Sequence, residues 1–91
     1  MAYQKPSFVL LMAMVQFKVG DELGFIFTVG AHTVAEVTKE AYYNCDIKNP
    51  ISIKDETPVL IHLTTPGFHY FICTKGDHCK SNMKIEINVL P

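Results

Sequence analysis

The sequence predicts a single small all-β domain of the sandwich type. Its 91 residues give room for one hydrophobic core. Short runs rich in β-branched and aromatic residues recur along the chain, and glycine, proline or polar residues separate them. Strands of this length at regular spacing are typical of a β-sandwich.

The strand predictions rest on apolar residues at every second position. Leu23, Phe25 and Phe27 follow this period, which is typical of a strand with one buried face. The turn residues Val29 and Gly30 end that run. Predicted strands cover residues 22–28, 33–37, 51–53, 59–63, 68–73 and 83–89, and a helical turn at 39–43 has Thr38 as its N-cap.

The first sixteen residues are predicted to stand apart from the domain at 17–91. Lys5 precedes a short apolar run, the arrangement of a secretory signal peptide, and the run is too short to span a bilayer. Because Val15 and Gln16 do not form a small-x-small cleavage site, retention as a substitute edge strand is the alternative.

Charge excludes one class of function. The formal net charge is −1 and the isoelectric point is near 6.4. No cluster of lysine and arginine is present to neutralise successive phosphates, so the chain is not expected to bind nucleic acid.

The stretch from Tyr70 to Met83 carries the chemistry. It places Cys73, His78 and Met83 at the spacing Cys-x4-His-x4-Met, and Gly76 permits a tight turn between the first two. A thiolate, two imidazoles and a weak axial thioether are the ligand types of a blue copper electron-transfer site. The motif therefore predicts such a site, provided that a second histidine joins it.

His32 is the candidate for that second histidine. It follows Gly30 and Ala31 at the entrance of a predicted strand. His69 lies four residues before Cys73 in one predicted strand, roughly 13 Å from its sulfur, which is too far to share an ion. His62 alternates with apolar residues and is expected to face water.

Five segments together resemble the phytocyanins, the blue copper proteins of plants. The resemblance covers the chain from about Phe17 to Leu90 and implies a cupredoxin Greek-key β-sandwich with one type 1 copper. It implies His32, Cys73, His78 and Met83 as ligands and a disulfide between Cys45 and Cys79. The axial methionine is similar to the plantacyanin and uclacyanin branches. The segments are Phe17-Lys-Val-Gly-Asp21, Gly30-Ala-His-Thr-Val34, Tyr43-Asn-Cys45, Gly67-Phe-His-Tyr-Phe-Ile-Cys73 and the loop from His78 to Met83.

Two departures from the family pattern bear on the fold and the site. In the family, further strands precede the Phe17 motif, whereas here the apolar run leads almost directly into it. We therefore expect residues 8–15 or a second chain, in a dimer, to replace a strand. Thr33 stands where the family commonly has an asparagine that joins the ligand loops, which predicts a less firmly locked site.

Other functions fit the sequence less well than a copper site. Zinc is disfavoured because adjacent His78 and Cys79 suit tetrahedral geometry poorly and methionine is not a zinc donor. No oxyanion hole or cleft marks Cys73 as a nucleophile, so an enzyme is not predicted. A metal-free extracellular structural or interaction domain, as in nodulin-like relatives, remains the alternative.

The resemblance also bears on partners and location. It implies electron exchange with a redox partner protein or a small-molecule reductant, outside the cell in the apoplast, where a disulfide persists. Association with the plasma membrane stays open, because no stalk and apolar tail for a lipid anchor appear before Pro91.

Overall fold

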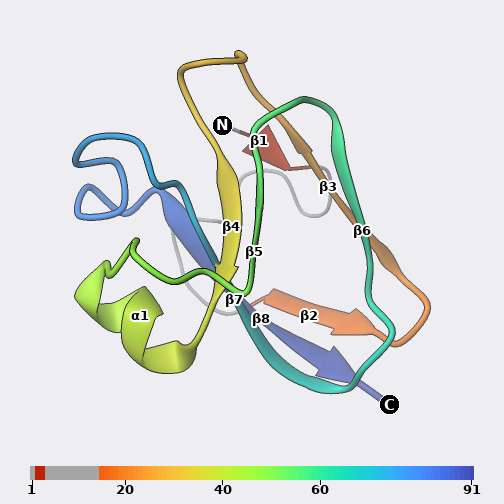
Figure 1. The fold of residues 1–91 in the computed structure, drawn as a ribbon. Coiled ribbons are helices and arrows are strands. Elements are labelled where there is room, and N and C mark those ends of the chain that lie inside the picture. The colour runs from red at the N-terminus through yellow and green to blue at the C-terminus, as the bar shows by residue number, and fades with distance from the viewer. Residues whose placement is uncertain (1, 4–14) are drawn as a thin grey trace.

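The computed structural model describes residues 2–3 and 15–91, which form eight strands and one short helix (Figure 1). In chain order the elements are β1 (Ala2–Tyr3), β2 (Val15–Lys18), β3 (Glu22–Ile26), β4 (Val34–Val37), α1 (Lys39–Asn44), β5 (Ser52–Lys54), β6 (Val59–His62), β7 (Gly67–Ile72) and β8 (Lys84–Leu90).

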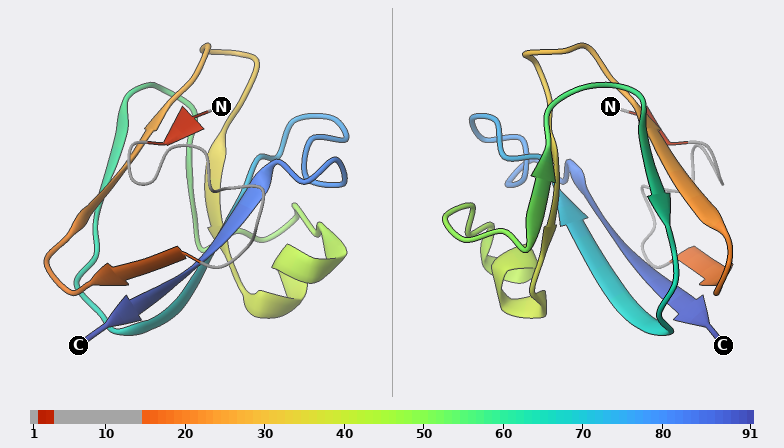
Figure 2. Two further views of the ribbon diagram at one scale, coloured as in Figure 1. Left: turned by 180° about the vertical axis from the view of Figure 1, so that it is seen from behind. Right: turned by 45° about the vertical axis from the view of Figure 1, so that its right-hand side comes forward.

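The strands form two sheets that face each other as the layers of a sandwich (Figure 2). One sheet has the order β1-β3-β6 and the other has the order β2-β8-β7-β4-β5. Neighbouring strands are antiparallel except β2 and β8, which run parallel. The predicted all-β sandwich is confirmed.

The main core lies between the sheets. Leu23 and Phe25 of β3 are fully buried, as is Ile87 of β8, which confirms the two-residue period predicted for these strands. The ring of Phe25 packs against that of Phe71 from β7, with their centroids 5.9 Å apart. Burial of these side chains is the main force that holds one sheet against the other.

The helix α1 covers the outer face of the five-stranded sheet. Thr38 caps it as predicted, because its hydroxyl accepts a hydrogen bond from the backbone N–H of Ala41 at 3.2 Å. Tyr42 packs with Ala35, Val37 and Ile72 in a second cluster on this face. The helix ends at Cys45, which has the left-handed φ of 52° that is common after a helix.

The predicted elements are all present, with ends that differ by one or two residues. Two strands are additional: β1 pairs Ala2 with Ile26 of β3, and β2 pairs Phe17 with Val89 and extends the larger sheet. Residues 1 and 4–14 lie outside the described part of the chain, so the interpretation of residues 1–16 as a leader or a substitute strand stays a prediction. In the described residues, no helix has the length and apolarity to cross a membrane.

Ile87 and Ile53 form a matched pair for testing this core. Ile87 is 0% exposed, whereas Ile53 on edge strand β5 is 49% exposed. Removing one buried methyl group leaves a small cavity, so Ile87→Val is expected to lower the free energy of unfolding by about 0.5–1.5 kcal/mol. Ile53→Val is expected to change it by less than about 0.5 kcal/mol in urea titrations. Equal losses in the two variants would contradict this placement of the core.

Candidate metal centre

Two loops meet at one end of the sandwich because β4 and β7 are antiparallel neighbours. Their register pairs Ala35 with Ile72. His32 lies shortly before β4 and Cys73 directly after β7, so the pairing brings residues 41 positions apart in sequence to the same place. A donor near the start of one strand therefore meets a donor at the end of the other.

Three predicted ligands converge at this point. The Cys73 Sγ lies 3.7 Å from Nδ1 of His32 and 3.4 Å from Nδ1 of His78. The ligand atoms of the three residues all lie within 4.8 Å of one another. Three donors around an ion at bond lengths of about 2.0–2.3 Å would be separated by about 3.5–4 Å in a trigonal plane. The residues present therefore fit one transition-metal ion.

The loop that carries His78 is closed by its own backbone. The N–H of Cys73 donates to the carbonyl of Met83 at 3.0 Å, and the N–H of Met83 donates to the carbonyl of His78 at 2.9 Å. Gly76 has a positive φ of 49°, as the turn predicted there requires, and Asn82 has a positive φ of 71°. These bonds fix where the loop leaves β7 and where it enters β8.

Met83 lies at the end of this loop, directly before β8. Its backbone is bonded to both Cys73 and His78, and its side chain is half-buried. These contacts place the backbone of Met83 next to Cys73 and His78. Its role as the fourth ligand stays a prediction.

The donors differ in exposure. Cys73 is 0% exposed, while both imidazoles are half-buried and their ring centroids lie 4.9 Å apart. Burial lowers the pKa of His32 below its ordinary value, and the neighbouring His78 lowers it further. This favours the neutral imidazole, which is the form that binds metal.

The other two histidines have partners elsewhere. His69 contacts Glu36 through Nδ1 at 2.9 Å and the carbonyl of Thr65 through Nε2 at 3.1 Å. His62 is exposed and lies 3.3 Å from Glu22. Among the described residues, His32, Cys73 and His78 form the one cluster of three or more His, Cys, Asp or Glu side chains that could hold a metal ion, and it contains neither of these histidines.

Thr33 joins the two ligand loops through hydrogen bonds to Thr74. It is 3% exposed, and its Oγ1 accepts a hydrogen bond from the N–H of Thr74 at 2.8 Å. The hydroxyls of Thr33 and Thr74 lie 2.7 Å apart. Each threonine directly follows a predicted ligand, so a hydroxyl pair links the chain at His32 to the chain at Cys73. The partner, 41 residues away, gives no local sequence signal.

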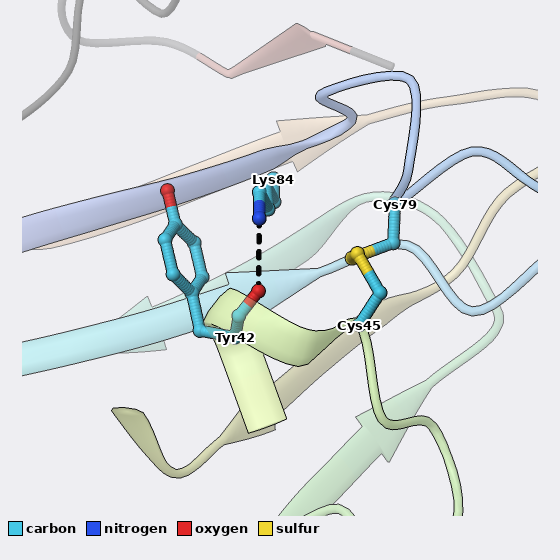
Figure 3. The surroundings of a disulfide bond; sticks show 4 residues. All are labelled: Tyr42, Cys45, Cys79 and Lys84. Carbon is cyan, nitrogen blue, oxygen red and sulfur yellow. Dashed lines mark hydrogen bonds between the residues drawn. A yellow bond between two sulfur atoms is a disulfide. The ribbon is translucent and has the colours of Figure 1, made fainter. Parts of the chain in front are cut away.

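Cys45 and Cys79 form a disulfide that attaches the ligand loop to the end of α1 (Figure 3). Among the described residues, Cys73 is the free cysteine. The thiol that can ligate a metal is thus separated from the pair that cross-links the fold.

Comparison with known proteins agrees with this geometry. Residues 4–83 match the family model of the plastocyanin-like domain, which is most of the chain. The chain belongs to the plastocyanin-like family. This plastocyanin-like domain is 50% identical over 74 residues to a blue copper protein of Arabidopsis thaliana, covering 81% of the chain and 38% of that relative. The chain thus spans less than half of the relative's length.

Solved structures place the plastocyanin-like domain among the phytocyanins, which confirms the resemblance found in the sequence. Cucumber stellacyanin is 39% identical, with a TM-score of 0.74 over 82% of this chain and 70% of its own. Spinach plantacyanin is 35% identical, with a TM-score of 0.73 over 81% of this chain and 80% of its own. The cupredoxin fold is therefore shared with proteins of this family.

The link between Thr33 and Thr74 gives a testable expectation for the plastocyanin-like domain. Thr33→Val keeps the shape of the side chain but leaves the N–H of Thr74 without its acceptor, so unfolding should cost about 1–3 kcal/mol less. Thr28→Val, at an exposed position of the same loop, should have an effect below about 0.5 kcal/mol. Chemical denaturation of both variants measures the difference, and equal stabilities would show that the hydroxyl pair does not lock the loops.

Proposed function

We propose that this domain is a blue (type 1) copper protein that carries single electrons outside the cell. The observation that carries the proposal is the approach of the Cys73 sulfur to Nδ1 of His32 and of His78, at 3.7 and 3.4 Å. A cysteine with two histidines is the equatorial ligand set of such centres, and Met83 would supply the weak axial donor. One copper per chain follows from one such set.

The predicted ligands would serve this function by keeping their positions while the charge of the bound metal changes. When bound, copper supplies a one-electron redox couple. The buried thiolate of Cys73 would bind the metal strongly, and the neutral imidazoles of His32 and His78 suit both oxidation states. The closed loop and the hydroxyl pair of Thr33 and Thr74 restrict movement of these donors. Restricted ligands keep the reorganisation on electron transfer small.

Exposure of the donors favours an electron carrier over an enzyme. A cysteine nucleophile has to reach its substrate, and Cys73 is 0% exposed. The half-buried rings of His32 and His78 are accessible instead, beside Val29, which is 60% exposed. We therefore propose this end of the sandwich, with the edge of His78, as the place where a redox partner or small reductant exchanges electrons.

The disulfide supports an extracellular location. Bonds such as Cys45–Cys79 persist in oxidising compartments and are rare in the cytosol. Secretion to the apoplast is consistent with the short apolar run that follows Lys5.

Copper addition separates this function from a metal-free structural domain. Purified protein titrated with Cu(II) is expected to develop the intense blue absorption of thiolate-to-copper charge transfer, at one equivalent per chain. Cys73→Ser should abolish the colour because the thiolate is its source. His62→Ala, which changes an exposed histidine away from the site, should keep it. A colourless wild-type protein would refute the copper proposal and favour the metal-free alternative.

The axial position has its own test. Met83→Leu retains the apolar bulk but removes the thioether, so the blue colour should persist. The reduction potential should rise, because a lost electron donor destabilises Cu(II) more than Cu(I). Protein-film voltammetry of the two proteins gives the difference. An identical potential would indicate that Met83 does not contact the metal.

A further inference from the structure

The two residues that follow the last two predicted ligands are both fastened to the same helix. Cys79 follows His78 and is bonded to Cys45 at the end of α1. Lys84 follows Met83 and contacts Tyr42 within α1, as Figure 3 shows. The helix thus holds the ligand loop at two points, each next to a donor.

Lys84 makes a specific contact with the last turn of α1. Its Nζ donates a hydrogen bond to the carbonyl oxygen of Tyr42 at 2.9 Å and lies 4.5 Å from the centroid of that ring. Carbonyls at the end of a helix lack intrahelical partners and carry partial negative charge. Because α1 has no basic residue in its own last turn, Lys84 supplies a positive charge from another element.

The attachment points are close together at the end of α1. Tyr42 and Cys45 are three residues apart, which is about 4.5 Å along a helix axis. On the loop side, the N–H of Met83 donates to the carbonyl of His78. The segment from His78 to Met83 is therefore restrained in two ways. Its own backbone closes it by a hydrogen bond, and the disulfide and Lys84 attach it to α1.

We propose that α1 is an external splint that sets the distance between His78 and Met83, with Lys84 as the positioning residue for Met83. The inference rests on the proposed copper function for its purpose, and it deepens that function by assigning a role to a residue that does not touch the metal. Lys84 acts through the helix it contacts and not through its charge at the metal.

Two lysines allow position to be separated from charge. Lys84→Met keeps an unbranched apolar stem over the tyrosine rings but removes the ammonium group. Lys80→Met removes the same charge from an exposed residue of the same loop, next to Cys79. An effect of charge alone appears in both variants, whereas an effect of position appears only in Lys84→Met.

Amide hydrogen exchange of the metal-free protein gives the first readout. The N–H groups of Met83 and Cys73, which close the loop, should exchange at least about tenfold faster in Lys84→Met, because local opening no longer breaks a charged hydrogen bond. The N–H of Ile87, in the core of β8, should be unchanged in the same sample. Lys80→Met should match wild type at all three positions.

The hydrogen-exchange results test the role of α1 and Lys84 independently of whether the domain binds copper. Wild-type exchange rates in Lys84→Met, or equal acceleration at Met83 and Ile87, would overturn it, since the second result reports only general stability. If Lys84→Met does not fold, Lys84→Gln, which keeps a shorter uncharged donor, is compared in the same way. Failure of wild type to turn blue would refute the copper function while leaving the exchange result intact.

In the copper-loaded protein, the electron paramagnetic resonance spectrum gives the second readout. Lys84→Met should change its rhombicity, which responds to the axial ligand, and Lys80→Met should not. An unchanged spectrum alongside faster exchange would limit the splint to the loop backbone and would overturn the role assigned to Lys84 in placing Met83.

Discussion

The antiparallel register between β4 and β7 is the constraint on which the site depends. It pairs Ala35 with Ile72 and so places Thr33 beside Thr74. A slip by one residue would turn the side chains of a strand to the opposite face of the sheet. Such a slip would turn Phe71, now 1% exposed, away from the core between the sheets and would separate the loops that carry His32 and Cys73. Core burial thus fixes the register, and the register brings the donors together.

Local features of this fold were predictable from sequence because their signals are local. The alternation of Leu23, Phe25 and Phe27 indicates a half-buried strand, and the Cys73-x4-His78 spacing places two donors on one loop. His32 was harder to assign because its contact with Cys73 spans 41 residues. Its prediction as a ligand rests on the need of the chemistry for a second imidazole and on the unsuitable positions of His62 and His69.

What could not be predicted depends on pairs that are distant in sequence and ordinary in type. Thr33 and Thr74 are 41 residues apart, and Tyr42 and Lys84 are 42 apart. A threonine or a lysine is normally a surface residue, so the residue types alone predict neither contact. Both become visible only when the sheet register and the position of α1 are known. The ends of the strands shifted by one or two residues for the same reason, because pairing and not propensity decides where a strand stops.

The groups that hold the donors are not the donor atoms themselves. Backbone N–H and carbonyl groups close the loop from Cys73 to Met83, hydroxyls link Thr33 to Thr74, and a disulfide and an ammonium group attach the loop to α1. The sulfur of Cys73 and Nδ1 of each imidazole are thereby left for a metal. Because none of these supporting bonds includes a donor atom, a change in metal charge would alter none of them directly. A scaffold built in this way can keep one ligand geometry for two oxidation states, which is the physical requirement for fast exchange of single electrons.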